Sequence, residues 1–235
     1  MQALGMYGYV DKYDFVISVS KTLGIMGKSV LVIDATSDEK YRYLIPAIDK
    51  SQCYLTQYSE IDFAVGFSSY EQLQSYLVER GIDIQRYSYV IIDVENYEGY
   101  RKFKGLEVNK AYMFIDTNVV SVARNDELVR VMRGENPEKE LLFTKVLYRA
   151  YMSRAANNYL EEKIGNYAVK WTDEVYEVSM DEQDVMINID SQYSGIVEIK
   201  KHTKTFVLYL CEFVSKILGD TSSKYILKEI KRRKN

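Results

Sequence analysis

The stretch MQALGMYGYVDKYDFVISVSKTLGIMGKSVLVIDA, residues 1–35, decides the fold. Its apolar start predicts a short strand, and the apolar residues that recur every three or four positions from 13 to 26 predict a helix with one buried face. Gly27 stands where many helices end. Residues 30–33 are continuously apolar, which is typical of a central parallel strand. The stretch therefore predicts one βαβ unit, and its first turn lies where α/β proteins hold phosphate.

Composition limits the classes of protein that fit. The chain of 235 residues suits one α/β domain, and a net charge of −3 gives no overall nucleic-acid-binding surface. Cys53 and Cys211 lie outside any metal or disulfide motif, and the single His202 argues against a histidine-based site. There is no signal peptide and no apolar run near the ~18 residues that span a bilayer. We expect a cytoplasmic protein, with the inner face of the membrane as the alternative location.

Strands and helices alternate along the rest of the chain, which predicts a mostly parallel sheet with helices on both faces. A strand at 87–93, YSYVIID, ends in Asp93, so this carboxylate should lie beside the first turn. The further elements predicted are a helix from 37–39 with Tyr41, Leu44, Ile45 and Ile48 inward, an extended segment within 54–67, a helix from Ser68 or Ser69 to Arg80, strands at 108–116, 141–148 and 167–171, helices at 117–133, 154–164 and 203–218, and an acidic segment at 173–190.

The first turn resembles the phosphate loop of the MinD/ParA group of P-loop ATPases, the deviant Walker A, SIMIBI-class family. There, K-G-G-V-G-K-T-T precedes a helix and a strand reading V-L-L-I-D-A-D. This chain has Y-G-Y-V-D-K-Y-D at 7–14 and V-L-V-I-D-A at 30–35, and its strand at 87–93 is similar to the family's Walker B strand, Y-D-Y-V-I-I-D. The resemblance implies a three-layer P-loop NTPase-like α/β fold, with a MinD/ParA-like domain over residues 1–220.

The resemblance also implies a nucleotide site. A phosphate loop closes backbone N–H groups around anionic oxygens, while a lysine reaches the phosphates and a hydroxyl binds magnesium. Transferred to this chain, the cofactor-binding positions are Gly8, Val10, Lys12 and Tyr13, and the carboxylates that would hold magnesium and serve catalysis, if ATP binds, are Asp34 and Asp93.

Four loop positions, Tyr9, Asp11, Tyr13 and Asp14, depart from the family pattern. Tyr9 and Asp11 replace the second and third glycines and crowd the cradle. Asp11 also brings negative charge towards a polyanion, and a unit charge pair at about 4 Å is worth roughly 4 kcal/mol at an effective dielectric near 20. Tyr13 replaces the magnesium-binding hydroxyl residue. The loop thus retains a cation, Lys12, and lacks most of the cradle.

Three further departures lie outside the cradle. Tyr7 stands in place of the signature lysine, which in the resembled proteins reaches the nucleotide of a dimer partner. Thr36 replaces the carboxylate that follows Asp34, and Tyr148 replaces the asparagine that reads adenine. The 22 tyrosines of the chain, an unusually large number, would supply packing and an adaptable contact surface, or simply reflect genome composition.

Residues 221–235 form a basic C-terminal helix or tail. Six cations and one anion fall within 224–234. One hypothesis is docking to a membrane or an anionic partner through an amphipathic helix, and the other is a final helix whose basic end complements its dipole. The residues that would make the contact are Ile226, Leu227, Ile230, Lys231, Arg232 and Arg233.

Three functional hypotheses follow. The first is a degenerate MinD/ParA-like, TadZ-like scaffold or localisation factor in pilus, secretion or division-type machinery, with protein partners and weak or no ATP turnover. The second is an active Mg-ATP-dependent dimeric switch with an unconventional loop. The third is a ParA-like DNA-associated partition protein, although nucleic acid is not the expected partner. We expect a homodimer, most simply without a cofactor, or with ATP and magnesium if the loop still works.

Overall fold

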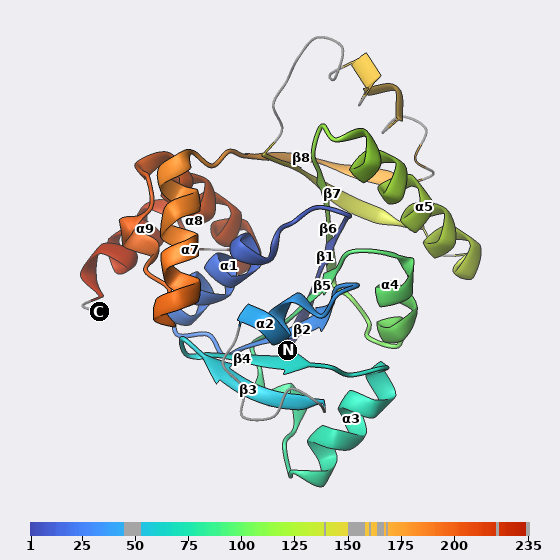
Figure 1. Cartoon of the computed structure of the whole chain (residues 1–235), viewed down its shortest axis with the longest axis horizontal. Helices are drawn as coiled ribbons and strands as arrows, with labels where there is room; N and C mark the ends of the chain where they lie inside the picture. The colour runs from blue at the N-terminus through green and yellow to red at the C-terminus, as the bar shows by residue number, and fades with distance from the viewer. Residues whose placement is uncertain are drawn as a thin grey trace.

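The computed structural model describes residues 1–44, 53–138, 140–149, 158–159, 161–163, 167, 169–219 and 221–233. Its centre is an eight-stranded sheet in the order β3-β4-β2-β5-β1-β6-β7-β8, parallel except for the β3/β4 pair (Figure 1). The strands are β1 (Gln2–Tyr7), β2 (Val30–Ala35), β3 (Tyr54–Tyr58), β4 (Ile61–Val65), β5 (Tyr89–Val94), β6 (Lys110–Ile115), β7 (Leu142–Tyr148) and β8 (Lys170–Val178).

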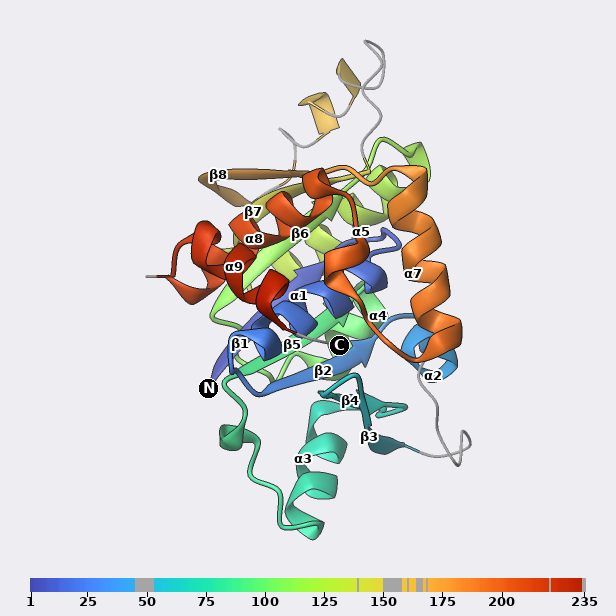
Figure 2. The same cartoon turned by 90° about the vertical axis from the view of Figure 1, so that its left-hand side faces the viewer.

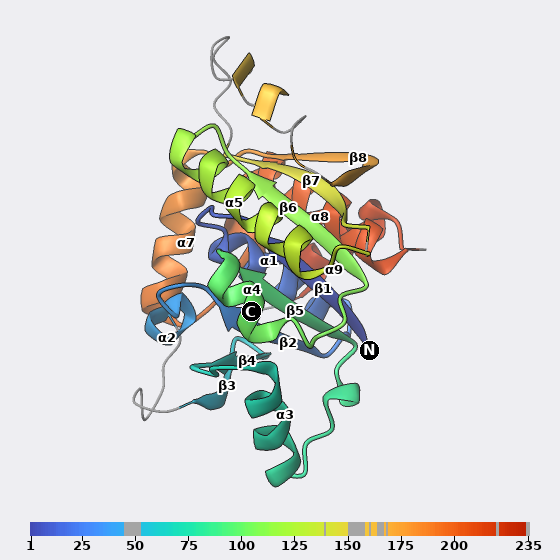
Figure 3. The ribbon, with the colours of Figure 1, turned by 90° about the vertical axis from the view of Figure 1, so that its right-hand side faces the viewer.

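Helices cover both faces of the sheet, which confirms the predicted three-layer fold. One layer contains α1, α7, α8 and α9, and the opposite layer contains α3, α4 and α5 (Figures 2 and 3). The helices are α1 (Tyr13–Ile25), α2 (Lys40–Leu44), α3 (Tyr70–Glu79), α4 (Tyr97–Phe103), α5 (Val119–Glu135), α7 (Glu182–Ser194), α8 (Lys204–Leu218) and α9 (Ser223–Arg232).

The layer on the α1 side is built around aromatic rings. Phe15 of α1 lies 5.2 to 6.3 Å, between ring centroids, from Phe114, Tyr148, Phe206 and Phe213, and it is fully buried. Because these partners come from β6, β7 and α8, the side chain of Phe15 packs an N-terminal helix and a C-terminal helix against the same part of the sheet. The apolar faces that the 3.6-residue periodicity predicts for α1 and α8 are therefore the faces that pack in this core.

Part of the tyrosine content packs in the core. Among the residues that the structure describes, eight tyrosines are buried, Tyr43 and Tyr193 are strongly exposed, and Tyr225 is half exposed. Burial raises the pKa of Tyr148, and the same cause, joined by Asp93, raises the pKa of Tyr41. The buried tyrosines therefore supply packing with a polar tip, and the exposed ones remain part of the surface.

Several element predictions need correction. The extended segment at 54–67 is a hairpin, because Ser59 and Glu60 both adopt left-handed φ angles (49° and 67°) and reverse the chain. The acidic segment at 173–190 contains most of β8 and α7, and β8 starts at Lys170 rather than at 167. Helix α4 was not predicted, because its seven residues are too few to give a periodicity. Ile45, Ile48 and most of the predicted helix at 154–164 lie outside the described residues.

The C-terminal tail is part of the domain rather than a separate unit. Ile226 and Ile230 of α9 are 0% and 3% exposed and belong to the core cluster on the α1 side, and Leu227 packs against that cluster. The apolar face predicted to meet a membrane or partner is thus turned inward, so the hypothesis of docking through these residues is corrected. None of the helices in the described ranges has the length and apolar character of a membrane span.

The burial of α9 gives a stability prediction. Replacing Ile226 by Ala leaves a cavity under α9, so we expect the free energy of unfolding to fall by about 2–4 kcal/mol. Tyr225→Ala is the matched control, because this side chain is half exposed, and it should change stability by roughly 0.5 kcal/mol or less. Urea denaturation followed by circular dichroism measures both. Equal effects of the two variants would mean that α9 does not pack on the domain.

Candidate functional site

The candidate site lies at the carboxyl ends of β1, β2 and β5, in the middle of the sheet. Asp34 and Asp93 are register partners on adjacent parallel strands, and Met6 pairs with Asp93 from the other side. The turn that follows β1 therefore starts directly beside both carboxylates. Ligands of open α/β sheets bind at this edge, so the structure brings the predicted carboxylates and the predicted loop together.

Lys12 lies inside the protein rather than at the mouth of the loop. Its side chain is 1% exposed, and Nζ is 2.8 Å from Oδ1 of Asp93. Nζ also donates to the carbonyl oxygen of Gly8 at 2.7 Å and to that of Val94 at 3.3 Å. A buried lysine needs such partners, because an unpaired charge in the interior costs several kcal/mol. The cation expected to reach phosphate thus holds the turn against β5.

The backbone donors at the start of the turn bond inward as well. The N–H of Gly8 donates to Val94 O (3.0 Å), that of Tyr9 to Oδ1 of Asn125 (2.7 Å), and that of Val10 back to Gly8 O (2.9 Å). Gly8 adopts φ +131°, and a Cβ there would lie 2.3 Å from the carbonyl oxygen of Phe114. Glycine is therefore required at position 8 for this packing, independently of any ligand.

Tyr41 connects the two carboxylates from α2. Its hydroxyl donates to Oδ2 of Asp93 at 2.8 Å, and its backbone N–H donates to Oδ2 of Asp34 at 3.1 Å. Oδ1 of Asp34 accepts from the N–H and the hydroxyl of Thr36. Burial raises the pKa of Asp34 to about 7, against these hydrogen bonds, which lower it, while the charge of Asp93 adds to the rise. Both carboxylates are thus occupied by protein groups.

A second ion-pair network lies at the outer end of the turn. Nζ of Lys40 is 2.9 Å from Oδ1 of Asp11 and 2.9 Å from Oε1 of Glu95, and Oε2 of Glu95 accepts from the Ser37 hydroxyl. Although burial lowers the pKa of Lys40, the hydrogen bonds to these two carboxylates raise it on balance. Lys40 therefore ties the turn, α2 and the end of β5 together, and two carboxylates surround it.

Tyr13 and Asp14, at the start of α1, face α7 and the end of β7. The hydroxyl of Tyr13 lies 3.5 Å from Nε2 of Gln192, and Asp14 contacts Gln192 (3.4 Å) and the Arg149 guanidinium (3.5 Å). Burial raises the pKa of Asp14 to about 6, against the opposing effect of Arg149. The two residues that replace the family's threonines thus support the packing of α7 on α1.

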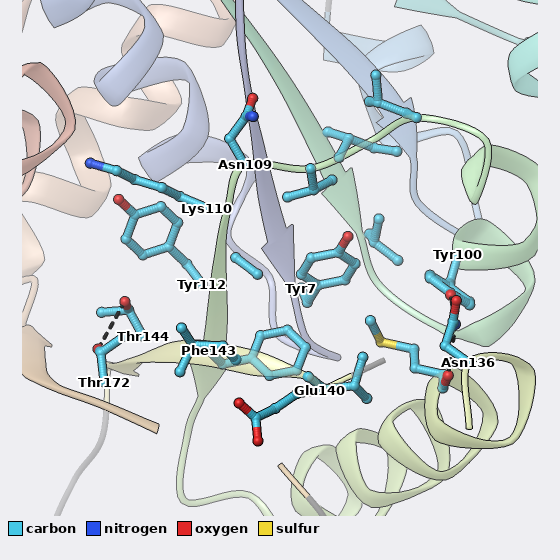
Figure 4. A pocket seen from close by; sticks show the side chains of 18 of the residues that line it. Tyr7, Tyr100, Asn109, Lys110, Tyr112, Asn136, Glu140, Phe143, Thr144 and Thr172 are labelled. Carbon is cyan, nitrogen blue, oxygen red and sulfur yellow. Dashed lines mark hydrogen bonds between the residues drawn. The ribbon is translucent and has the colours of Figure 1, made fainter. Parts of the chain in front are cut away.

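Tyr7 turns away from the loop. Its ring folds back over Gly5, where a Cβ would lie 2.2 Å from the ring, and only 5% of Tyr7 is exposed. It lines a cavity of about 400 Å³ together with Tyr100, Asn136 and Phe143, and Figure 4 shows its ring among these residues. The residue at the signature-lysine position thus points into the α4/α5 layer and is not placed to reach across a dimer.

Tyr148, at the position that reads adenine in the resembled family, is also internal. It is fully buried against Phe15 and Phe114, and its hydroxyl contacts the sulfur of Met180 at 3.4 Å. The side chain therefore belongs to the aromatic core on the α1 side of the sheet.

Sequence reasoning missed three residues that shape this site: Tyr41, Lys40 and Asn125. Tyr41 was expected on the inner side of its helix, but periodicity alone does not tell which polar group a buried hydroxyl meets. Asn125 is fully buried on α5, donates to Phe114 O at 3.0 Å and accepts from Tyr9 N. A polar residue inside the apolar face of a predicted helix was the available signal for it.

ATP and magnesium do not fit the site as it stands. The N–H groups of Gly8, Tyr9 and Val10 donate to Val94 O, the Asn125 side chain and Gly8 O. The Lys12 ammonium is paired with Asp93, which also accepts from the Tyr41 hydroxyl. Asp11 and Glu95 add negative charge at the outer end. Among the residues that the structure describes, no group of three or more His, Cys, Asp or Glu side chains is placed to hold a metal ion. We therefore derive no chemical step through nucleotide.

The strand order, the turn after β1 and the paired carboxylates define a P-loop NTPase-like fold, and solved structures give its type. The chain matches MinD in the MinC:MinD cell division complex of Aquifex aeolicus (TM-score 0.62, 11% identity, covering 94% of this chain and 97% of that one). It also matches Cyanothece McdA(D38A) with ATP (0.59, 12%, 94% and 98%) and a Borrelia burgdorferi plasmid partition protein (0.53, 16%, 85% and 97%). No protein-family model and no curated protein matches.

These similarities establish a MinD/ParA-type fold over nearly the whole chain. At 11 to 16% identity they carry no information about which residues act. Two of the similar structures come from proteins of cell division and plasmid partition, and the McdA structure is a complex with ATP. Those properties belong to those proteins, and their bearing on this chain is a matter of proposal.

The buried Asp34 gives a pH prediction. Its pKa is raised from 3.8 to about 7, so the folded protein keeps a proton that the unfolded chain releases above pH 4. The free energy of unfolding should therefore fall as pH rises from about 4 to 7, by up to about 1.4 kcal/mol per pH unit from this group.

Asp34→Asn removes the titrating group and should flatten this part of the profile. Asp14, whose pKa is also raised, remains in both proteins, so the comparison isolates Asp34. Urea denaturation at pH 5 and pH 8 measures the difference. Parallel profiles of wild type and variant would contradict the assigned shift.

Proposed function

We propose that this chain is a scaffold or localisation protein of the MinD/ParA fold type that acts by binding protein partners, without efficient ATP turnover. The observation that carries the proposal is the position of Lys12, whose ammonium is buried against Asp93 at 2.8 Å. The lysine that would reach phosphate instead holds the turn to the sheet. On this proposal Gly8, Val10 and Lys12 are structural residues of the turn.

The electrostatic surroundings support the same proposal. Asp11, Asp14, Asp34, Asp93 and Glu95 face three cations around the turn, and each of those cations has a carboxylate within 3.5 Å. A triphosphate would have to displace these pairs and approach the remaining carboxylates. Each unit charge pair at 4 Å is worth roughly 4 kcal/mol at an effective dielectric near 20, so the balance opposes binding.

The positioning role rests on the fold and on the proteins that share it. A homodimer is part of the proposal, but the arrangement of Tyr7 argues against a dimer that reads the partner's nucleotide, because its ring is buried in the α4/α5 layer. The basic residues Lys231, Arg232 and Arg233 at the end of α9 are exposed, and they remain candidates for contact with an anionic partner.

An active ATPase is the second candidate, and one observation favours it. Gly8, Lys12, Asp34 and Asp93 stand together at the carboxyl edge of the sheet, so release of Lys12 from Asp93 would free a cation and a carboxylate in the right region. In that case Asp34 and Asp93 would be the magnesium-binding and catalytic residues. The two candidates differ in whether the turn opens.

Isothermal titration with ATP and magnesium separates them. We expect no binding heat at millimolar ATP, because the Lys12 ammonium is paired with Asp93 and the N–H groups of Gly8, Tyr9 and Val10 are bonded internally. The triple variant Tyr9→Gly, Asp11→Gly, Tyr13→Thr is the matched comparison and should bind more tightly, since it restores cradle space and removes a repelling charge. Micromolar binding by wild type that is lost in a folded Lys12→Ala variant would contradict the proposal and establish the ATPase alternative.

A further inference from the structure

Helix α7 presents an apolar strip to solvent. Val185, Met186, Ile189 and Tyr193 are 37%, 59%, 45% and 88% exposed. The spacing of 186, 189 and 193 places them along one side of the helix, as in the seam of a helix pair. Figure 2 shows α7 at the outer edge of its layer, beside α2. Because contiguous exposed apolar surface is typical of interaction sites, this strip is a candidate for one.

The opposite side of α7 is fixed to the protein. Asp184 accepts from the N–H and the hydroxyl of Thr203 at 2.8 Å each, and the Tyr58 hydroxyl donates to the Ser191 carbonyl at 2.8 Å. Gln192 contacts Asp14, as described above. The strip is therefore carried on a firmly held helix, and its side chains do not belong to the core of their own chain.

The charged residues that α7 exposes are both negative, Glu182 and Asp190. Together with Met186 they line a shallow hollow next to the strip. Lys201 lines the hollow as well, and its ammonium is already paired with Glu198. A surface that combines apolar side chains with acidic ones fits a helix that carries an aromatic or apolar residue among cations.

Helix α9 of the same chain has this chemistry on its outer face. Lys224, Lys228 and Lys231 are exposed at spacings of four and three residues, and Tyr225 among them is 50% exposed. Within the described ranges none of these three lysines takes part in an ion pair. The inner face of α9 packs in the core, so its outer face is the one that can contact a partner.

The two helices lie at opposite ends of one layer, with α1 and α8 between them (Figures 2 and 3). A chain therefore does not place its own α9 on its own α7. We propose that the outer face of α9 docks on the apolar strip of α7 in a second copy of the chain. The contact is head-to-tail, so unless it closes into a ring it continues from copy to copy. It goes beyond the proposed function and does not depend on nucleotide.

Charge decides against the simplest alternative, a symmetric α7-to-α7 pair. That arrangement would bring Glu182 and Asp190 of both copies into one contact without a cation from α7 itself. The heterologous contact instead sets these two carboxylates against Lys224 and Lys228. It should therefore form faster and more strongly at low ionic strength, because exposed charges are screened by salt.

Sedimentation velocity of the full chain over a concentration series, without nucleotide, tests the contact. We expect association that weakens at least about tenfold between ~50 and ~500 mM NaCl. The α7 variant Glu182→Lys/Asp190→Lys and the α9 variant Lys224→Glu/Lys228→Glu should each be monomeric, since each places like charges against the wild-type partner. The control Lys28→Glu/Lys102→Glu changes the same charge at exposed sites elsewhere and should associate as wild type does.

Mixing gives the decisive result. The α7 variant presents a cationic strip and an unchanged cationic α9, while the α9 variant presents an unchanged acidic strip and an acidic α9. Neither variant matches itself, but each of the two surfaces of one variant matches a surface of the other. A mixture should therefore associate again, with the two variants alternating along the head-to-tail assembly. The inference is overturned if wild type is monomeric at all concentrations and both salts. It is also overturned if only the α7 variant loses association, because α9 would then take no part in the contact, or if the mixture stays monomeric.

Discussion

The ion pair between Lys12 and Asp93 joins the turn after β1 to the central strand β5, and the surrounding groups depend on it. Because both side chains are buried, neither can lose its partner without a cost of several kcal/mol. Tyr41 donates hydrogen bonds to Asp93 from its hydroxyl and to Asp34 from its backbone N–H. The carbonyl oxygen of Gly8 accepts from the Lys12 ammonium. The turn is thus held from inside, in the region where a phosphate loop would be held by its ligand.

Most of the fold could be predicted from the sequence, because its main signals are local. The continuous apolar runs of β2 and β5 and the one-sided periodicity of α1 and α8 report burial directly. The features that were not predicted depend on contacts between residues far apart in the sequence. The sequence of α9 indicates a free amphipathic tail, but in the structure Ile226 and Ile230 are buried in the core. The seven residues of α4 are positioned by the Asn96 cap and by the close approach of Gly99 to Ala35 O.

For the candidate site, only the location of its residues in the fold could be predicted, not the partners of their side chains. Resemblance placed Gly8, Lys12, Asp34 and Asp93 at one edge of the sheet, and the structure has them there. Spacing does not tell whether Lys12 points outward or inward, because that depends on Asp93 from another strand and on Asn125, which takes the Tyr9 amide. A glycine at position 8 likewise serves two purposes, and here the close approach of Phe114 O accounts for it.

Amide hydrogen exchange in the turn, followed by NMR with and without ATP and magnesium, tests the central claim most directly. The account predicts slow exchange of the Gly8 and Tyr9 amides and no saturable shift on adding nucleotide, since Val94 O and the Asn125 side chain already accept from them. Asn125→Ala should release protection at Tyr9 and leave Gly8 protected. Rapid exchange of both amides in the wild-type protein, or a saturable change of both signals with ATP, would contradict the account.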